Sequence, residues 1–261
     1  KEDTLLSIDL ETTSVKTMEA EIVGLSFSIE QDSGIYIPIR HKDKSSQYFG
    51  ENELEEVITL VKPVLENPRI PKTGQNVKYD ILILNRFGIQ VKGIEFDTMI
   101  AAHLLQPGSR SYKLDKLSEE YLSYTMVPIE QLIGTGKNQI SMAEVGLEDI
   151  AFYAVEDADI ALQLTHVLKK RLEKENLWEF YSKVELPLIQ ILTDMEYKGT
   201  YVQKDLLDKL SREYLKQIES LVAEIYVLSG TEFNINSTQQ LAQILFDILK
   251  LPTIRKRSTA E

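Results

Sequence analysis

Two acidic residues at the end of an apolar run are the first residues of this sequence that could do chemistry. The stretch "LLSIDLETTS" (5–14) contains Asp9 and Glu11, separated by a single residue. Positions i and i+2 of an extended strand point to the same face, so the two carboxylates would lie side by side. Like charges at that separation repel each other, and a fold normally avoids the pairing. The sequence therefore predicts a partner that neutralises both carboxylates.

Two further segments supply acids that could join this pair. The stretch "GQNVKYD" contributes Asp80 at the start of a helix, and "FYAVEDAD" contributes Tyr153 and Asp157. Tyr153 and Asp157 are spaced i, i+4 and would share one helix face. Four carboxylates from three segments would hold two divalent cations, which would neutralise the Asp9 and Glu11 pair.

A cluster of this kind predicts a phosphodiester hydrolase. Two cations about 4 Å apart stabilise both the attacking and the leaving oxygen of an in-line phosphoryl displacement. A tyrosine one helical turn from a ligand carboxylate can orient the attacking water through its hydroxyl group.

Each acid also has an ordinary structural interpretation. A lone D-x-E occurs by chance, Tyr153 and Asp157 could be a satisfied helix surface, and Asp80 could simply begin a helix. Their joint occurrence in this strand and helix context favours the catalytic interpretation. Other acids of the same stretches are expected to be structural: Asp97 as a helix cap, and Asp149, Glu156 and Asp159 as solvated residues.

Composition narrows the choice of metal. The chain has 261 residues, of which 43% are hydrophobic and 27% charged, as in an ordinary globular protein. It has no Cys, which excludes thiolate sites, and only three His, which argues against a His-rich zinc site. Carboxylates and backbone oxygens remain, and these are ligands for hard cations such as Mg²⁺ or Mn²⁺.

Charge and hydropathy bear on partners and location. The net charge of -12 argues against a broad, non-specific coat of nucleic acid, although a local basic groove is compatible with it. No apolar run approaches the roughly 20 residues that span a bilayer. No signal peptide precedes "KEDTLL" and the first residue is not Met, so we expect an excised piece of a cytoplasmic, monomeric protein.

The order of predicted elements indicates an α/β fold, a mixed sheet flanked by helices and followed by an all-helical segment. Strands are expected at 4–9, 21–29, 34–39 and 69–74, where Ile, Leu and Phe runs are bounded by turn residues. Helices are expected at 51–67, 76–88, 96–108, 113–122 and 147–177, and a Gly-rich loop at 129–146. Beyond residue 178 the pattern is amphipathic and helical, with helices at 204–228 and 233–251 and a Ser237/Thr238 cap. We therefore expect a domain boundary near residue 178.

The motifs resemble the proofreading part of bacterial DNA polymerase I of the Klenow type. They are similar to DnaQ-like 3′–5′ exonucleases of the Asp-Glu-Asp-Asp class in the variant that uses Tyr. The resemblance runs through "SIDLETTS", "GQNVKYDILIL", "FDTMIAAHLL", "GKNQ" and "YAVEDADIALQL". It continues through "ELPLIQILTDMEYKGTYV" and "FNINSTQQLAQILF", and so covers essentially the whole chain.

The resemblance implies a ribonuclease H-like exonuclease domain at 1–178. It also implies a helical connection and the truncated start of a polymerase thumb domain at 179–261. The palm carboxylates of a polymerase are absent, so this chain by itself should not synthesise DNA. The implied partners are a single-stranded DNA 3′ end and, through the rest of a polymerase, a primer-template.

Residue roles follow from the same resemblance. Asp9, Glu11 and Asp157 would ligate the tighter of two Mg²⁺ or Mn²⁺ ions, Asp80 would bind the second largely through water, and Tyr153 with Glu11 would orient the nucleophilic water. The implied substrate contacts are Thr12, Val15, Gln75, Asn76 and Lys78. Glu120 and Ile129 depart from the family pattern, because some members have a basic and an aromatic residue there.

Two alternative functions remain open. Some members of the family have lost the carboxylates and are inactive scaffolds, whereas all four acids and Tyr153 are present here. An exoribonuclease of the RNase D type uses the same acidic set, but residues 179–251 resemble a polymerase connection rather than an RNA-binding helical domain.

Overall fold

A mixed four-stranded sheet organises the first part of the chain. The computed structural model describes residues 4–41 and 54–252. The chain divides into two compact units, Lys1–Gly199 and Thr200–Glu261. The sheet has the strand order β3-β2-β1-β4 and comprises β1 (Leu6–Thr12), β2 (Ile22–Glu30), β3 (Ser33–Pro38) and β4 (Lys72–Thr73). β1 pairs antiparallel with β2 and parallel with β4.

The alternation of side chains along β1 separates an apolar face from an acidic one. Leu6, Ile8 and Leu10 are buried in the main hydrophobic cluster together with residues of α1 (Leu54–Leu65) and α2 (Val77–Arg86). Because successive side chains of a strand point to opposite faces, Asp9 and Glu11 lie on the other face of the sheet. The amphipathic pattern of α1 was predicted at 51–67, of which 51–53 lie outside the described residues.

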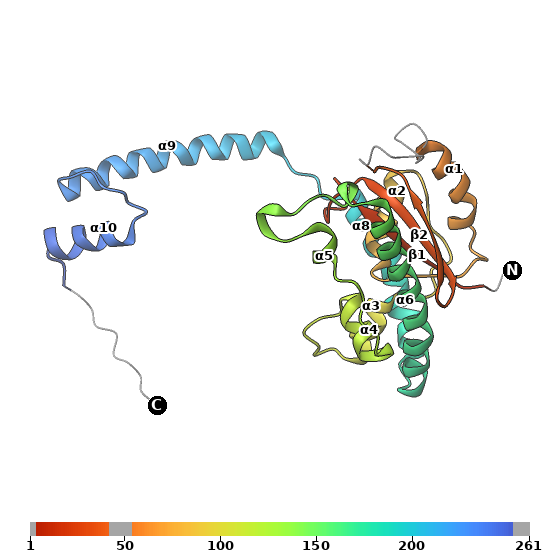
Figure 1. Cartoon of the computed structure of the whole chain (residues 1–261). Helices are drawn as coiled ribbons and strands as arrows, with labels where there is room; N and C mark the ends of the chain where they lie inside the picture. The colour runs from red at the N-terminus through yellow and green to blue at the C-terminus, as the bar shows by residue number, and fades with distance from the viewer. Residues whose placement is uncertain (1–3, 42–53, 253–261) are drawn as a thin grey trace, which may run out of the picture. The chain divides into compact units, whose positions relative to one another are not determined.

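The second face of the sheet is covered by the long helix α6 (Leu147–Lys174), which contacts β1, β2 and β3 (Figure 1). α3 (Thr98–Leu105) and α4 (Leu114–Leu122) in turn contact α6. The hydroxyl groups of Thr73 in β4 and Thr165 in α6 are hydrogen-bonded to each other at 2.6 Å, and both residues are buried. These layers confirm the predicted mixed sheet flanked by helices.

The predicted Gly-rich loop at 129–146 contains short helices. They are α5 (Ile129–Ile133) and two 3₁₀ turns, Gly136–Asn138 and Met142–Glu144. The second turn has a capping box, in which the Ser141 hydroxyl accepts from Ala143 N and the Glu144 carboxylate accepts from Ser141 N. Short-range capping therefore orders a segment whose Gly content predicted a loop.

Residues beyond 177 form a nearly continuous helical stretch. It consists of α7 (Trp178–Phe180), a π-helical segment (Tyr181–Glu185) and α8 (Leu186–Lys198). Tyr181 is fully buried, and its ring is tilted against Phe96 and stacked on Trp178, at ring-centroid distances of 5.0 and 5.6 Å. The sequence placed a boundary near residue 178, whereas the first compact unit extends to Gly199. The assignment of 1–178 and 179–261 as functional domains stays a prediction.

The second unit is helical, as predicted. It contains α9 (Lys204–Ser229), α10 (Thr238–Ala242) and a π-helical segment, Gln243–Ile248. The Ser237 hydroxyl caps α10 by accepting from Gln240 N at 3.4 Å, in agreement with the predicted cap. Within residues 4–41 and 54–252, none of the helices combines the length and apolar character that crossing a bilayer requires.

Candidate active site

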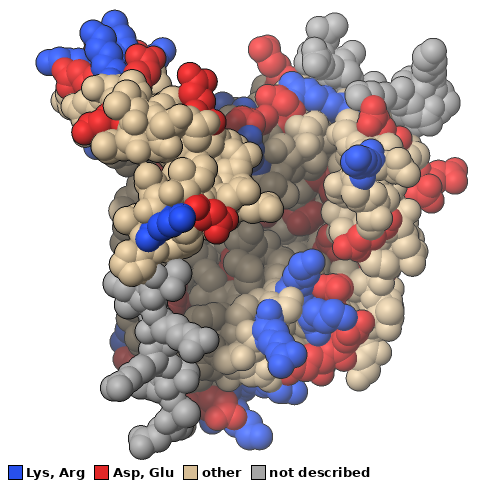
Figure 2. Space-filling view, turned by 90° about the vertical axis from the view of Figure 1, so that its left-hand side faces the viewer, with Lys and Arg blue, Asp and Glu red and all other residues tan. Residues whose placement is uncertain are grey.

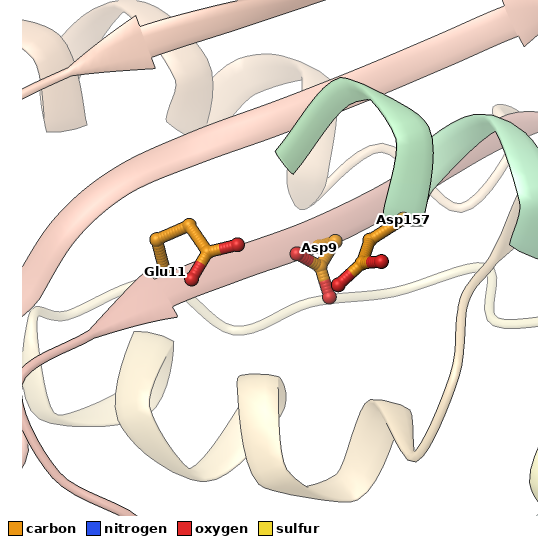
Figure 3. Close-up of side chains that lie close together, drawn as sticks. All are labelled: Asp9, Glu11 and Asp157. Atoms are coloured by element: carbon orange, nitrogen blue, oxygen red, sulfur yellow. The ribbon is translucent and has the colours of Figure 1, made fainter. Parts of the chain in front are cut away.

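Three of the predicted acids converge where β1 ends beneath α6. Asp9 and Glu11 project from β1 and Asp157 from α6, and one carboxylate oxygen of each lies within 4.8 Å of the other two (Figure 3). Asp9 and Glu11 are adjacent because they share one face of the strand, and Asp157 reaches them because α6 crosses that face. Three carboxylates at such separations can hold a single divalent cation, which favours oxygen ligands.

The pairing of β1 with β2 becomes irregular at the end of β1. Glu11 pairs with Gly24 of β2, but Thr12 pairs with Ile22, so β2 carries an extra residue opposite the end of β1. Such bulges alter the direction of a strand and recur next to active sites. Here the irregularity follows directly after Glu11 and marks the end of the acidic face.

Burial and mutual repulsion raise the pKa values of these acids. Burial raises the pKa of Asp9 to about 6. The pKa of Glu11 lies well above its usual range, first through burial and then through the charges of Asp9 and Asp157. Burial and the Asp9 charge act in the same direction on the pKa of Asp157. The ionised cluster is therefore unfavourable by itself, and a cation would favour it.

Tyr153 lies one helical turn before Asp157 on α6. The interaction of its hydroxyl group with the Asp157 carboxylate lowers the pKa of that acid, against the larger effect of burial. The Tyr153 ring packs against a small hydrophobic cluster that includes Val23 and Ile150. Burial, followed by the charges of Asp157, Glu11 and Asp9, raises the pKa of Tyr153. The hydroxyl therefore keeps its proton at neutral pH and can donate it in a hydrogen bond.

Asp80 reaches the same region from the first turn of α2. The turn between β4 and α2 lies so close to β1 that a Cβ at Gly74 would be 2.6 Å from Ile8 O. The glycine therefore permits the close approach of α2 to β1. Burial, followed by the charges of Asp9, Asp97 and Glu11, raises the pKa of Asp80 well above its usual range.

A carboxylate oxygen of Asp80 that accepts no hydrogen bond from the described residues supports a second cation position. Asp80 is 2% exposed, and its Oδ2 atom has no hydrogen-bond partner among the described residues. A buried polar atom without a partner is costly unless a ligand satisfies it. The acidic donors of the site thus fit divalent cations, and Asp80 lies outside the group of three that can share one ion.

A cleft opens beside Glu11. Its volume is about 550 Å³, and it lies between the end of β1 and the segment that begins with α5. Thr12 and Val15 line one wall, and Ile129, Ile133 and Ile140 contribute to the other. Val15 is 90% exposed, so its apolar surface is open to a ligand. The structure therefore brings Thr12 and Val15, but not all the predicted substrate contacts, to this cleft.

Gln75 and Asn76 instead lie in the turn that leads into α2, and Lys78 lies in the first turn of that helix. Both polar atoms of the Gln75 side-chain amide are hydrogen-bonded within the protein. Its Nε2 donates to Tyr112 O at 2.7 Å, and its Oε1 accepts from the Thr98 hydroxyl. Asn76 adopts a left-handed conformation with a φ of 55°. Lys78 forms an ion pair with Glu196 of α8. None of the three lines the cleft next to Glu11.

Sequence reasoning missed Tyr79. Its hydroxyl donates to Ser14 O at 2.6 Å and lies 2.5 Å from Thr12 Oγ1. It therefore ties α2 to the chain that leaves β1, directly beside the acidic cluster. The only sequence signal for Tyr79 is that it directly precedes Asp80, because its partners Thr12 and Ser14 are more than 60 residues away in the sequence.

Both signs of charge occur on the face of the protein that Figure 2 shows. On the face shown in Figure 2, Lys and Arg side chains are interspersed with Asp and Glu side chains. The basic side chains on that face therefore do not form a broad surface of one charge.

Family models match two parts of the chain. A 3′–5′ exonuclease model matches residues 1–173, and a model of DNA polymerase family A matches residues 204–261. The first match covers the sheet, its flanking helices and every acid of the cluster.

Curated relatives are similar in sequence over nearly the whole chain. The chain is 35% identical to DNA polymerase I of Rhizobium leguminosarum over 272 residues, and 42% identical to DNA polymerase I of Chloroflexus aurantiacus over 242 residues. The alignments cover 98% and 92% of this chain, but 27% and 25% of those proteins. The chain thus spans about a quarter of the length of these relatives.

Solved structures share the fold. The POL domain of Pol1 from M. smegmatis, in complex with DNA primer-template and dNTP, superposes with a TM-score of 0.71 at 24% identity. That match covers 99% of this chain and 40% of the other. Brucella melitensis NrnC with bound Mg²⁺ superposes with a TM-score of 0.55 at 19% identity and covers 77% of this chain and 90% of the other.

Proposed function

Because this chain belongs to the 3′–5′ exonuclease family of the DNA polymerase I proteins, we propose that it removes nucleotides from DNA 3′ ends. The substrate would be a single strand or a frayed end, as in proofreading, and the reaction would be metal-dependent phosphodiester hydrolysis. The observation that carries the proposal is the convergence of Asp9, Glu11 and Asp157, whose ligand atoms lie within 4.8 Å of one another.

Each residue of the site would have a distinct role. Asp9, Glu11 and Asp157 would hold one divalent cation, and Asp80 with Asp9 a second. When bound, Mg²⁺ or Mn²⁺ ions at such a site supply charge stabilisation for the attacking and leaving oxygens of an in-line displacement. Tyr153 and Glu11 would orient the attacking water by hydrogen bonds.

The cleft beside Glu11 supports a single-stranded substrate. Its apolar wall, which includes Val15 and Ile129, would contact bases without regard to their sequence, because every base has an apolar face. A stacked duplex would keep the last phosphodiester away from the acids. A mispaired terminus unpairs at least cost, so it would be cleaved preferentially.

The remaining assignments also belong to the proposal. Residues 1–178 would form the exonuclease domain and residues 179–261 the helical connection and the start of a polymerase thumb. A primer-template would bind through the rest of a polymerase. We expect the chain to act as a monomer, and Gln75, Asn76 and Lys78 to guide the strand as it approaches the cleft.

The first experiment follows a 5′-labelled, single-stranded DNA incubated with the purified chain in Mg²⁺, in Mn²⁺ and in EDTA. The matched control is Asp9→Ala, which removes the carboxylate shared by both proposed cation positions. We expect a ladder that shortens from the 3′ end, depends on the metal and is absent in the variant. A second strand of the same sequence with 2′-hydroxyl groups is assayed in parallel.

Each of the other outcomes points to a different function. Faster degradation of the strand with 2′-hydroxyl groups would replace the proposal with an exoribonuclease of the RNase D type. Absence of degradation in both metals would mean that the acids are idle and that the chain is a scaffold.

A further inference from the structure

Asp97 is a buried acid outside the cation cluster, and its carboxylate accepts hydrogen bonds from the N-terminal backbone amides of two helices. It precedes α3, and its Oδ1 accepts a hydrogen bond from Ile100 N at 3.0 Å, as a helix cap does. Its Oδ2 accepts from Val77 N, the first residue of α2, at 2.8 Å. The residue is fully buried. One side chain thus satisfies backbone donors of two helices, one donor being Val77 N, 20 residues before Asp97 in the sequence.

α2 depends on this distant cap because its own capping position provides none. Asn76 precedes α2 in a left-handed conformation, and its side chain makes no capping hydrogen bond. The backbone amides of Asn76 and Met99 also favour the ionised form of the Asp97 carboxylate, together with those of Val77 and Ile100. Uncapped backbone donors at a buried helix start would be costly, and the Asp97 carboxylate supplies the missing acceptor.

The capped turn carries Asp80. Val77 and Asp80 belong to the same first turn of α2, so a change in the position of that turn displaces the Asp80 carboxylate. Both residues are buried against the sheet, where neighbouring side chains cannot compensate for a displacement without losing contacts. The position of Asp80 relative to β1 therefore depends on the hydrogen bond between Val77 N and Asp97.

Asp97 is itself held by the helical stretch that follows α6. The hydroxyl group of Tyr181 accepts from Asp97 N at 2.7 Å and donates to Asp97 O at 3.3 Å. The Tyr181 ring is fully buried and packs against Phe96 and Trp178, whose rings also contact each other. The main chain of Asp97 is thus fixed by a buried tyrosine, and its carboxylate fixes α2.

We propose that Asp97, held by Tyr181, is a positioning residue that sets the place of Asp80 and thereby the affinity of the second cation position. The inference rests on the proposed function, because it takes Asp80 to be a cation ligand. Groups that orient metal ligands typically change metal affinity or activity about 10- to 100-fold when they are mutated.

The test uses three variants of the whole chain. Asp97→Asn keeps one of the two side-chain oxygens that accept hydrogen bonds, so either Val77 N or Ile100 N loses its acceptor. The substitution also removes a negative charge near Asp80. Tyr181→Phe leaves that charge in place, retains the ring and removes only the hydroxyl that holds Asp97. Ile83→Val is the matched control, since it loosens the buried side of α2 without touching the cap.

Two readouts separate positioning from stability. Hydrogen exchange of the Val77 and Ile100 amides is measured by NMR in the metal-free protein, and Mn²⁺ binding is measured by calorimetric titration. We expect about tenfold faster exchange of at least one of the two amides in Asp97→Asn, since a capping bond is lost. The dissociation constant of the weaker Mn²⁺ position should rise about 10- to 100-fold in Asp97→Asn and less in Tyr181→Phe. Ile83→Val should leave both quantities unchanged.

The inference is overturned if Asp97→Asn and Tyr181→Phe bind Mn²⁺ as the wild type does, or if Ile83→Val weakens the same position equally. Nuclease assays on the same samples test the proposed function separately. A wild-type chain that degrades no DNA would refute that function, whereas the exchange and Mn²⁺ titrations would still decide whether Asp97 positions Asp80.

Discussion

Tyr153 lies one turn before Asp157 on α6, and its hydroxyl group interacts electrostatically with the Asp157 carboxylate beside the acidic residues of β1. Tyr153→Phe removes this hydroxyl and keeps the ring in its cluster. We expect the rate of DNA hydrolysis to fall about 100-fold, which is the low end of what a positioned proton-transfer or water-orienting group contributes. Metal binding and the free energy of unfolding should change little. Single-turnover degradation of labelled DNA at saturating Mg²⁺ measures the effect.

The matched control for that variant is Tyr214→Phe on α9, where the tyrosine is exposed. It should leave the rate unchanged. An equally active Tyr153→Phe enzyme would show that the hydroxyl takes no part in orienting the water.

Asp9→Asn should abolish activity and stabilise the metal-free protein. In the absence of a cation the Asp9 charge raises the pKa values of Glu11, Asp80 and Asp157, so its removal relieves repulsion within a buried site. We expect a gain of about 1 kcal/mol in the free energy of unfolding, as is common when a strained functional group is replaced. Thermal unfolding in EDTA, followed by calorimetry, measures this gain.

Addition of Mg²⁺ should reverse the order of stability. A ligand that binds only the folded state raises its stability, and only the wild type retains the shared carboxylate. If Mg²⁺ raised the melting temperature of Asp9→Asn as much as that of the wild type, Asp9 would not be a ligand.

Gly24→Ala should destabilise the protein through Tyr36. Gly24 lies opposite Glu11 in the sheet, and a Cβ there would overlap the ring and hydroxyl of Tyr36. The Tyr36 hydroxyl is hydrogen-bonded to His41 Nε2 at 3.0 Å, so the ring cannot move without losing that contact. We expect a loss of about 1–3 kcal/mol, as for other overpacked sites, measured by urea unfolding.

Two variants check the cause of that loss. Gly108→Ala, where a Cβ would meet no atom within 4 Å, should be neutral or slightly stabilising. A second substitution, Tyr36→Leu, should recover part of the stability of Gly24→Ala. The absence of any recovery would assign the loss to the backbone of β2 instead.

Lys72 should make stability rise with pH in the alkaline range. It is fully buried, and its Nζ donates to the carbonyls of Asn67, Ile70 and Lys92 at 2.9, 2.9 and 2.7 Å. Burial lowers the pKa of Lys72 to about 8, whereas an unfolded lysine titrates near 10.4. Between these values the unfolded chain holds the proton and the folded chain does not, so the free energy of unfolding rises with pH. The slope from this group approaches about 1.4 kcal/mol per pH unit.

Lys72→Met isolates this contribution. It leaves three buried carbonyls without their donor, and we expect it to cost about 3 kcal/mol at pH 7. The difference in unfolding free energy between wild type and variant should widen from pH 8 to 10. A difference that stays constant over this interval would show that the lysine does not titrate there.

Glu196→Gln should strengthen the binding of single strands. Glu196 of α8 forms an ion pair with Lys78, one of the proposed strand contacts. Because a partly exposed ion pair contributes about 1 kcal/mol at most, release of Lys78 should lower KM up to about fivefold at low salt, with kcat unchanged. The salt dependence of KM over a titration of KCl checks the electrostatic origin.

Glu213→Gln on α9 is the control, since its pair with Lys209 is long at 3.9 Å. Lys78→Met should raise KM, and in that background Glu196→Gln should have no further effect. Additive effects of the two substitutions would contradict the proposed competition between Glu196 and the strand.

Local periodicity determined the parts of the site that lie within one element. Asp9 and Glu11 share a face because a strand repeats every two residues, and Tyr153 and Asp157 share one because a helix repeats every 3.6. Asp97 was predicted as a cap and is one. These relationships depend on backbone geometry over a few residues, so the sequence alone was enough to predict them.

Only the tertiary structure decided what lies between elements. Glu156 and Asp159 were expected to be solvated, yet both are buried. Glu156 accepts from the Tyr124 hydroxyl and Val127 N, and Asp159 from Asp32 N and Gln163. The expectation was wrong because Tyr124, Val127 and Asp32 come from segments that no local pattern links to α6.

The same reason explains the rest of the site. Three contacts join residues that are far apart in the sequence, by between 20 and 148 positions. They are the approach of α6 to β1, the contact of Tyr79 with Thr12, and the hydrogen bond from Val77 N to Asp97. Such contacts arise from the burial of whole apolar faces, which a single strand or helix pattern does not orient relative to another. The sequence by itself determined which side chains could do chemistry, and the packing of the sheet against its helices decided which of them meet.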